Sequence, residues 1–494
     1  MSEPLALLPL ALAAGGGRIS SFGADASAGY DAQQLVAAGF TLLQRSAQVV
    51  RALSGRRSAI LLPTSPAFLT ALAASDGRGA VLINPLAAPA EIAFQCADAG
   101  VGAIFTTTAF ASRLPAGLTT IFLDDAPRSA RVVGDGRTVD VDLGAHHGLA
   151  IEGQRDAEGR DEEAVIVYTS AMRGTPLGAI LTHRNLLANA RSTSQALENT
   201  ATDHVLSVLP FAHLFGLTGT CSAPLLAGAR ITTMDRFNPL KAVEFIASGG
   251  VTQVIGVPAV FHALLVAMSR RGLDIRNSAL RLTICGGAPL PRDLQDRWAD
   301  ATGFELRQGY GLTEAGPVCL FNRGDRPNVR GTMGVALPGV EVGIFSPADY
   351  SRDDDAPGPA TELADGTPGE LCVRGPNVFR GYIGGKPGLP LRGDWLCTGD
   401  LCARHPDGSV EFLGLVKSMF TRNGFNIYPR ELERVVGALP GVVRVEASAI
   451  PEPSKENDIR LRIVGTITED EVKQWCEPRL SAYKQPSVIE IVTS

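Results

Sequence analysis

The alternation of helical and strand patterns over residues 41–285 constrains the fold more than any other feature of the sequence. Apolar runs with the length of buried strands recur between stretches of helical spacing, such as the one marked by Phe68 and Leu72. Strand–helix–strand repetition predicts parallel sheets covered by helices on both faces. Ligands of such sheets bind at the carboxyl ends of the strands. The loops that we therefore expect at the site follow Tyr168, Leu209, Cys285 and Gln308.

The pattern changes after about residue 330. Segments at 340–345, 369–374 and 409–413 alternate in polarity and are separated by turn residues, which predicts a β-rich subdomain. The predicted fold class is α/β: parallel-sheet α/β subdomains and the β-rich subdomain form an N-terminal domain (residues 1–413), followed by a small, mobile α+β domain (residues 414–494).

Composition and charge narrow the class of protein. The chain is 45% hydrophobic and 19% charged, which is typical of a globular protein, and its net charge of −6 disfavours a nucleic-acid partner. Its eight cysteines include no Cys-x-x-Cys pair and fit reduced thiols better than a zinc site. The apolar run at 5–14 lacks a basic flank and is too short to span a bilayer. We expect a soluble, cytoplasmic protein without a transmembrane segment; its oligomeric state stays open.

The segment 164–187, AVIVYTSAMRGTPLGAILTHRNLL, suggests a phosphate-binding loop. We expect a strand at Ala164–Val167, a helix from Thr182, and a connection rich in Ser, Thr, Gly and Pro. Such a loop can surround a phosphate with backbone N–H groups and hydroxyls. An ordinary Gly/Pro connection would have the same composition, so this segment alone does not decide.

Three further motifs carry chemical groups. GYGLTE (309–314) combines glycines that permit close backbone approach with a stacking face at Tyr310, a hydroxyl at Thr313 and a carboxylate at Glu314. Alone, it could be a turn followed by a helix cap. CGGAPL (285–290) is a second glycine-rich loop after a predicted strand, and WLCTGD (395–400) ends in Asp400, whose carboxylate suits the two hydroxyls of a ribose.

In order and spacing, these motifs resemble those of the adenylate-forming superfamily, which includes acyl-CoA and aryl-CoA synthetases, luciferases and adenylation domains of peptide synthetases. The resemblance covers roughly residues 40–490 and extends to INPL (83–86), PFAHLFGL (210–217), GVPAVF (256–261), GELCVRGPNVFRGY (369–382) and NGFNIYPRELE (423–433). It implies an ATP-dependent, AMP-forming acid–thiol ligase. A carboxylate and ATP–Mg²⁺ would give acyl-AMP and pyrophosphate, and the thiol of CoA or of a carrier-protein phosphopantetheine would take the acyl group.

The resemblance also implies roles for the matching residues. Adenine would be held by Gly287, Ala288, Pro289, Gly309, Tyr310 and Gly311, with Tyr310 stacked on it, and ribose by Asp400. The phosphate loop would use Thr169, Ser170 and Gly174. Thr313 would contact the α-phosphate, and Glu314 would help to hold Mg²⁺. His213 would lie beside the substrate carboxylate, unless it is a core histidine, and Lys417 is the basic residue of the hinge.

Two further sets concern the substrates. Candidates for the acyl pocket, any apolar member of which could instead be plain core, are Phe211, Phe215, Leu217, Val257, Phe261 and Gly286. The loop near the thiol would contain Gly424 and Asn426. An apolar pocket fits fatty, aryl or alicyclic acids alike, so the acid is not identified.

The departures from the family pattern concern positive charge. In YTSAMRGTPLG (168–178), Leu177 replaces the family's lysine, and in the hinge Leu415 and Ser418 replace an arginine and an acidic residue. The sequence also stops before the position of the family's C-terminal lysine. We therefore expect an impaired adenylation step. One alternative is an enzyme that retains only thiol transfer or needs a second polypeptide to supply the missing lysine. The other is a non-catalytic relative that binds acyl-AMP, a nucleotide or a partner protein.

Overall fold

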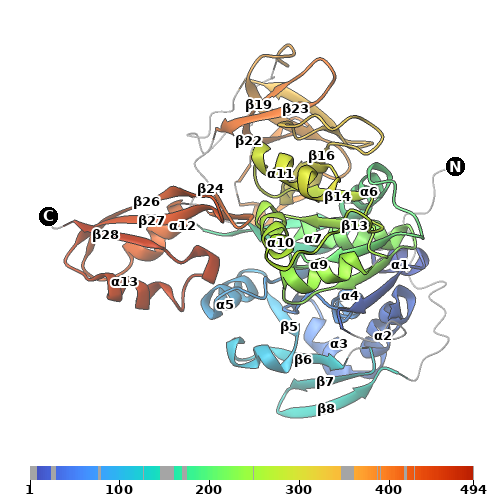
Figure 1. Cartoon of the computed structure of the whole chain (residues 1–494). Helices are drawn as coiled ribbons and strands as arrows, with labels where there is room; N and C mark the ends of the chain where they lie inside the picture. The colour runs from blue at the N-terminus through green and yellow to red at the C-terminus, as the bar shows by residue number, and fades with distance from the viewer. Residues whose placement is uncertain are drawn as a thin grey trace.

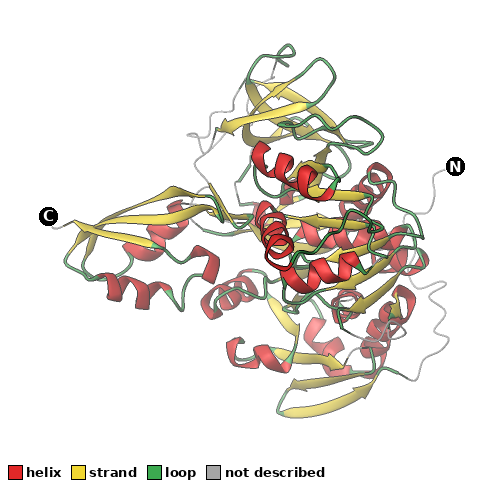
Figure 2. Ribbon diagram, viewed as in Figure 1, coloured by secondary structure: helices red, strands yellow, loops and turns green. Residues whose placement is uncertain are grey.

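The computed structural model describes residues 8–23, 29–75, 79–125, 127–144, 161–169, 175–248, 250–346, 361–386, 388–389, 391–416, 420–427 and 429–492. Two nine-stranded sheets form the large domain, and their central strands are parallel (Figures 1 and 2). A smaller sheet lies at one end of this domain, and the C-terminal segment projects from its side. The predicted α/β fold class, with a β-rich subdomain and a small α+β C-terminal part, is confirmed.

The first large sheet has the order β17-β16-β15-β14-β13-β11-β12-β1-β2, parallel from β15 to β1 and antiparallel at both edges. Its strands are β1 (Arg18–Ser21), β2 (Tyr30–Asp31), β11 (His204–Ser207), β12 (Arg230–Thr233), β13 (Gln253–Gly256), β14 (Leu282–Cys285), β15 (Leu306–Gly311), β16 (Val318–Phe321) and β17 (Val335–Ala336).

The second large sheet has the order β20-β10-β9-β4-β3-β5-β6-β7-β8 and is parallel from β9 to β6. Its strands are β3 (Arg57–Ile60), β4 (Ala80–Leu82), β5 (Val101–Thr106), β6 (Thr119–Asp125), β7 (Ser129–Gly134), β8 (Arg137–Asp142), β9 (Glu163–Thr169), β10 (Leu177–Thr182) and β20 (Gly381–Tyr382). Because β10 pairs antiparallel with β9, the expected phosphate loop joins two strands of a hairpin. The expectation that it leads directly into a helix was wrong.

Helices form layers between and outside the two sheets. One hydrophobic core contains residues of both sheets and of the helices packed between them, α1, α2, α4 and α6, whereas α9, α10 and α11 cover the outer face of the first sheet and α5 that of the second. The helices are α1 (Leu8–Ala14), α2 (Ala32–Arg45), α3 (Ala47–Leu53), α4 (Ala67–Ala74), α5 (Pro89–Asp98), α6 (His183–Ala196), α7 (Leu214–Leu217), α8 (Ala223–Leu226), α9 (Pro239–Ala247), α10 (Pro258–Arg271) and α11 (Arg292–Thr302).

Local sequence explains several helix ends. The Thr182 hydroxyl accepts from the Asn185 N–H (3.2 Å), and the Asn185 side chain accepts from the Thr182 N–H (2.9 Å), a reciprocal cap that starts α6. Helix α10 begins at Pro258 and ends before Gly272, whose φ of +63° is left-handed.

In the N-terminal apolar run, α1 is buried against the rest of the large domain. None of the helices in the described ranges is long and apolar enough to cross a membrane.

The remaining strands belong to two smaller units. The β-rich subdomain contains β18 (Glu341–Phe345), β19 (Gly369–Arg374), β21 (Leu391–Arg392), β22 (Trp395–Arg404) and β23 (Val410–Leu415). The C-terminal unit contains β24 (Phe420–Arg422), β25 (Phe425–Ile427), α12 (Pro429–Gly437), β26 (Val442–Glu452), β27 (Glu456–Gly465), α13 (Glu469–Cys476) and β28 (Val488–Val492), and has its own core around Val436, Ile459 and Leu461.

Candidate active site

The motif loops meet at the carboxyl ends of the parallel strands, as expected. Thr169 ends β9, His213 follows β11, Val257 follows β13, Gly286 follows β14, and Gly309–Gly311 end β15. Two cavities at this edge share part of their walls. Gly286 and Gly309–Gly311 line the first, Thr169 lines the second, and His213 lines both. The C-terminal unit lies over this edge beside α5 (Figure 1).

On the expected adenosine side, the Tyr310 hydroxyl donates a hydrogen bond to Asp400 Oδ2. Burial and then the nearby Asp400 charge raise the pKa of Tyr310 well above its ordinary value, so the phenol remains a donor. Asp400 is 8% exposed and pairs with Leu415 across β22 and β23. Leu415, at the position of the family's arginine, therefore adds no charge beside this carboxylate. Gly287, Ala288 and Pro289 follow β14 at the same edge, where Gly287 and Pro289 are exposed.

On the expected phosphate side, Glu314 accepts hydrogen bonds from two hydroxyl groups. Its Oε1 atom accepts hydrogen bonds from Thr169 Oγ1 (3.3 Å) and from Tyr382 Oη (2.7 Å), and the residue is 6% exposed. Tyr382 was not among the predicted site residues, although it ends the GELCVRGPNVFRGY motif. Ser170 and Gly174 lie outside the described residues.

The Glu314 carboxylate fits the expected Mg²⁺. Both hydroxyls donate to Oε1, and no described hydrogen bond engages Oε2. Mg²⁺ commonly takes one or two carboxylate ligands together with substrate phosphates and water. Within the described ranges, no cluster of three or more His, Cys, Asp or Glu side chains could hold a metal without the substrate.

His213 lies where the two cavities adjoin. It caps the short helix α7, and its Nδ1 atom accepts a hydrogen bond from the Phe215 N–H (3.2 Å). Burial lowers the pKa of His213 to about 4, so the ring is neutral at physiological pH. Since Nδ1 is an acceptor, the proton is on Nε2, which can donate to a substrate carboxylate.

The first cavity, called the acyl cavity below because it contains two of the predicted acyl-pocket residues, has a volume of about 90 Å³. It runs from Gly309 and His213 along β13 and β14 to α6. Of the predicted acyl-pocket residues, Phe215 and Gly286 line it. No local pattern in the sequence pointed to the other apolar wall residues, which are Ala196, Leu197, Ile255, Ile284, Leu312, Pro317, Val318, Phe321 and Leu337.

Three predicted acyl-pocket residues lie in the hydrophobic core and not on the wall of this cavity. Phe211 packs edge-on against Phe68 at 5.6 Å, and Phe261 packs against Trp298 at 5.0 Å between ring centroids. Leu217 is 1% exposed and belongs to the main core. Val257 lies instead at the contact with the C-terminal unit.

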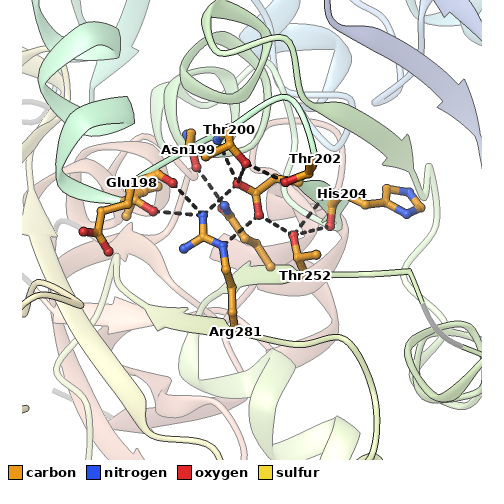
Figure 3. Close-up of polar contacts among 10 residues, drawn as sticks. Glu198, Asn199, Thr200, Thr202, His204, Thr252 and Arg281 are labelled. Atoms are coloured by element: carbon orange, nitrogen blue, oxygen red, sulfur yellow. Dashed lines mark hydrogen bonds and ion pairs between the residues drawn. The ribbon is translucent and has the colours of Figure 1, made fainter.

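A polar cluster lies next to Leu197, a residue on the wall of this cavity; Figure 3 shows its contacts. Arg281 donates to both carboxylate oxygens of Asp203 (2.7 and 2.8 Å) and to the carbonyl oxygens of Leu197 and Glu198 (3.0 and 3.1 Å). Burial alone would raise the pKa of Asp203, but hydrogen bonds from Arg281 and Thr252 and the Arg281 charge outweigh it and hold that pKa well below its ordinary range. The cluster thus anchors Leu197, a wall residue, to the start of β14.

The predicted thiol-side loop contacts the large domain. Gly424 has a φ of +75°, and a Cβ atom there would lie only 2.5 Å from Val257 Cγ1, so both its backbone conformation and its close approach require glycine. Gly424 also lines the acyl cavity, and its N–H donates to Glu456 Oε2 (2.9 Å). The backbone of Asn426 lies in β25, but its side chain is outside the described part of the chain, as is Lys417.

The second cavity, of about 390 Å³, is a cleft between the two domains. His213 and Thr313 line it as well as the acyl cavity. Beside it, Lys484 Nζ donates to Glu91 Oε1 of α5 (2.8 Å) and to Glu431 Oε1 of α12 (2.9 Å), and Ser481 donates to Glu91 Oε2. Lys484 is 7% exposed, so this ion pair joins the domains with little contact with solvent.

Solved structures with the same fold cover nearly the whole chain. o-Succinylbenzoate CoA synthetase from Bacillus subtilis, bound to a product analogue, gives a TM-score of 0.79 at 23% identity and covers 99% of this chain and 95% of its own. A malonyl-CoA ligase with methylmalonyl-CoA and AMP gives 0.77 at 25% identity (99% and 98%). ATP-bound MatB from Rhodopseudomonas palustris gives 0.66 at 26% identity (99% and 95%).

The relatives found by sequence are also named as CoA ligases or synthases. A feruloyl-CoA synthase from Amycolatopsis sp is 31% identical over 446 residues, covering 88% of this chain and 84% of the relative. A long-chain-fatty-acid–CoA ligase from Escherichia coli O157:H7 is 29% identical over 472 residues, covering 88% and 82%. The predicted class, an ATP-dependent, AMP-forming acid–thiol ligase that uses ATP, Mg²⁺ and a thiol, is confirmed. Residues 42–383 match the model of the AMP-binding enzyme family, and the chain belongs to that family.

Proposed function

We propose that the protein joins a carboxylic acid with an apolar body and no second charge to CoA through an acyl-AMP intermediate. The observation that carries this proposal is that His213 and Thr313 line both cavities. An acid in the first cavity and a thiol in the second would therefore meet at these two residues. His213 Nε2–H would orient the carboxylate, and Thr313 would contact the α-phosphate.

In the first half-reaction, a carboxylate oxygen attacks the α-phosphate of ATP, and pyrophosphate leaves. Positioning and charge stabilisation do most of this work, because the carboxylate already carries the attacking electron pair. A Mg²⁺ held by Glu314 and the phosphates would neutralise charge on the triphosphate. In the second half-reaction, the thiol gives up its proton to solvent and its sulfur attacks the acyl carbonyl carbon. The bond from that carbon to the phosphate oxygen breaks, and AMP leaves.

The lining of the acyl cavity supports an acid without a second charge. None of its described lining residues is Asp, Glu, Lys or Arg, so a second carboxylate on the acid would be buried without a partner. Aryl, fatty and alicyclic acids all meet this condition.

The placement of the C-terminal domain supports the proposal that this conformation is the one in which the thiol attacks. The Gly424 loop reaches the acyl cavity, and the ligase with bound acyl-CoA and AMP superimposes better than the ATP-bound relative of similar identity. Because both relatives cover the same share of the chain, the difference in TM-score fits a different placement of the C-terminal domain.

We further propose that adenylation is slow. Leu177 is 7% exposed and opens β10 opposite Thr169, so the family's lysine position is an apolar residue in the core. The described cations that line the two cavities, Arg434, Arg479 and Lys484, all belong to the C-terminal domain. Each missing cationic contact to the triphosphate would cost about 10²–10³ in rate, although such effects seldom add.

Location and acceptor complete the proposal. All eight cysteines are buried free thiols, which supports a reducing compartment, and we assign the protein to the cytoplasm. CoA is the acceptor that we propose, and a carrier-protein phosphopantetheine is the alternative.

The test separates the half-reactions. With a panel of aryl and fatty acids, we expect little ATP–pyrophosphate exchange but measurable thioester formation from supplied acyl-AMP and CoA. Leu177→Lys should raise exchange only in part. Exchange at rates typical of the family would refute the impairment, and absence of both activities would favour a non-catalytic binder of acyl-AMP.

A further inference from the structure

The part of the C-terminal domain that reaches the acyl cavity is a two-residue turn. Asn423 and Gly424 join β24 to β25 and have φ values of +52° and +75°. Such left-handed values are typical of Asn-Gly turns in β-hairpins. The turn contacts the loops after β13 and β14, since a Cβ atom on Gly424 would lie 2.5 Å from Val257 Cγ1, and one on Gly287 would lie 3.8 Å from the Gly424 carbonyl oxygen. The position of this turn therefore determines how closely the C-terminal domain approaches the cavity.

Glu456, the first residue of β27, binds this turn from within the C-terminal domain. Its Oε2 atom accepts a hydrogen bond from the Gly424 N–H (2.9 Å). Beside it, the Lys455 carbonyl oxygen accepts one from the Asn423 N–H (2.9 Å). The carboxylate thus holds the residue of the turn that touches the large domain.

Glu456 holds this position at a cost. Its φ of +65° lies in the left-handed region, which is unfavourable for a residue with a Cβ atom. Its second carboxylate oxygen, Oε1, is buried and has no hydrogen-bond partner among the described residues. Glycine at this position would avoid both costs. Residues that keep such costs cluster at functional sites.

The surrounding charges place the Glu456 carboxylate at the domain contact. Lys455 and Arg422, the cations next to this contact in the chain, pair with Asp458 at 3.5 and 2.6 Å. Burial raises the pKa of Glu456, although the backbone N–H groups that donate to it oppose this shift. After burial, the Glu456 charge is the second cause that raises the pKa of Cys285, the last residue of β14. The carboxylate therefore acts across the boundary between the domains.

We propose that Glu456 is a positioning residue for thiol transfer. Its carboxylate fixes the Asn423–Gly424 turn against the loops after β13 and β14, and so holds the C-terminal domain beside the acyl cavity while the thiol attacks. This inference rests on the proposed function, because it takes this domain orientation as the one of thiol attack. Glu456 itself touches neither the acid nor the thiol and acts through the turn.

Three substitutions of Glu456 separate its hydrogen bond from its backbone cost. Glu456→Gln keeps an acceptor oxygen, Glu456→Ala removes the acceptor but keeps a Cβ atom, and Glu456→Gly removes both. With supplied acyl-AMP and CoA, we expect the alanine and glycine variants to lower kcat about tenfold, since a hydrogen bond to a charged acceptor is worth roughly that factor. Their KM for CoA should change little, because Glu456 does not touch the thiol. Glu456→Gln should stay within about threefold of the wild-type kcat.

Two further measurements distinguish positioning from general support of the fold. The affinity for AMP should match that of the wild type in all three variants, because Asp400 and Tyr310 belong to the large domain. The urea unfolding midpoint of Glu456→Gly should be no lower than that of the wild type, since glycine adopts a positive φ without a Cβ penalty.

A matched control is Glu452→Ala. Glu452 lies opposite Glu456 in the same hairpin, but its described hydrogen bonds come from Ser454 (3.2 and 2.9 Å). This variant should leave the kcat of thiol transfer and the affinity for AMP unchanged.

Three results would overturn the assignment. Alanine and glycine variants as fast as the wild type would show that the turn keeps its place without this carboxylate. A loss of AMP affinity, or a lower unfolding midpoint of Glu456→Gly, in parallel with the loss of kcat would mean that Glu456 only supports the fold. A Glu456→Gln protein as slow as Glu456→Ala would exclude the hydrogen bond to Gly424 as the cause. Failure of the proposed function is distinct, because the wild type itself would then form no thioester from supplied acyl-AMP.

Discussion

His213 is the residue at which the acid and the thiol would meet, and burial keeps it neutral. Its pKa is lowered to about 4, whereas an unfolded chain has a histidine pKa near 6.5. Between these values the unfolded state binds more protons, so this group makes stability rise with pH and contributes fully above about 6.5. On acidification through that window the contribution is lost, at up to about 1.4 kcal/mol per pH unit.

The corresponding prediction concerns His213→Gln, which keeps a side-chain donor and cannot titrate. From pH 5 to pH 7, wild-type stability should rise more steeply than that of the variant, by up to about 2 kcal/mol over the interval. Urea unfolding midpoints at several pH values measure this difference. His204, whose pKa is also lowered to about 4 by burial and then by the Arg230 charge, is present in both proteins and cancels in the comparison. Parallel curves would mean that His213 is not buried as a neutral ring.

The second prediction at the scale of residues concerns AMP binding by variants of Asp400 and Tyr310. We expect Asp400→Asn to weaken AMP binding by about 1–3 kcal/mol, because charge-assisted hydrogen bonds to ribose are lost. Tyr310→Phe removes only the hydroxyl that donates to Asp400 and should cost less, since the stacking ring remains. Calorimetry with AMP measures both. Asp365→Asn is the control, because Asp365 pairs with Arg404 on an exposed surface, and a loss there as large as that of Asp400→Asn would contradict the assignment.

Polar candidates for the site are easier to name from the sequence than apolar ones. Thr313, Glu314 and Asp400 stand in short motifs of unusual composition, so their chemistry is visible locally. Ile255 and Leu337, by contrast, look like any core residue, and only the path of β13 and the fold around it place them on the cavity wall. Phe211 and Phe261 show the converse, since their motifs are distinctive but their rings pack into the core.

At the scale of elements, β10 shows why a short apolar run is ambiguous. Leu177–Thr182 is buried throughout and directly precedes α6, so periodicity alone does not distinguish a strand from an extended entry into the helix. The antiparallel pairing with β9 depends on Val165, Ile166 and Val167 being opposite, which is a tertiary fact. The outer strands of both sheets were less predictable than the parallel centres for the same reason.

A substitution of Arg281, which directly precedes β14, tests how the start of this strand shapes the acyl cavity. Arg281→Met would leave Asp203, which is 3% exposed at its side chain, without its ionic partner, and would release the carbonyl oxygens of Leu197 and Glu198. We expect a loss of about 3 kcal/mol in the free energy of unfolding, together with broader acid selectivity from a looser wall. Denaturant unfolding and the acid panel measure the two effects.

The control is Arg276→Met. Arg276 pairs with Asp274 at 3.7 Å, and both side chains are 55% exposed, so its loss should cost less than about 1 kcal/mol. Equal destabilisation by the two substitutions would show that the Arg281 cluster has no special structural role.

At the scale of the whole molecule, the domains meet at the edge where all the site loops end. The sequence predicted this C-terminal unit from its motifs, but not its placement. Among the described residues that hold this placement, Glu91, Ser481 and Lys484 look like ordinary surface residues in sequence. Burial alone would lower the pKa of Lys484, yet the surrounding negative groups, Glu431 and Glu91 among them, outweigh it and raise that pKa, so the lysine stays charged within the interface.

Glu91 should therefore decide how firmly this orientation is held. Glu91→Gln keeps the size of the side chain and a partner for Ser481, while Lys484 retains Glu431 within its own domain. Losing one charged contact should disfavour this orientation by about 1–3 kcal/mol. We expect thioester formation from supplied acyl-AMP to fall several-fold, ATP–pyrophosphate exchange to stay equal or rise, and small-angle scattering without ligand to indicate a larger share of other orientations. An acyl-AMP analogue with CoA should restore the wild-type curve, because ligands that bind one orientation shift the population toward it.

The matched substitution is Glu469→Gln, which removes an exposed ion pair with Lys473 inside α13; neither residue is among the described residues that line the interdomain cleft. It should change neither half-reaction nor the scattering curve. A Glu91→Gln protein that loses both half-reactions equally would show only general damage to the fold. If instead its scattering and its thioester rate both match the wild type, the ion pair around Lys484 does not set the orientation, and the Gly424–Val257 contact must hold the C-terminal domain against the acyl cavity.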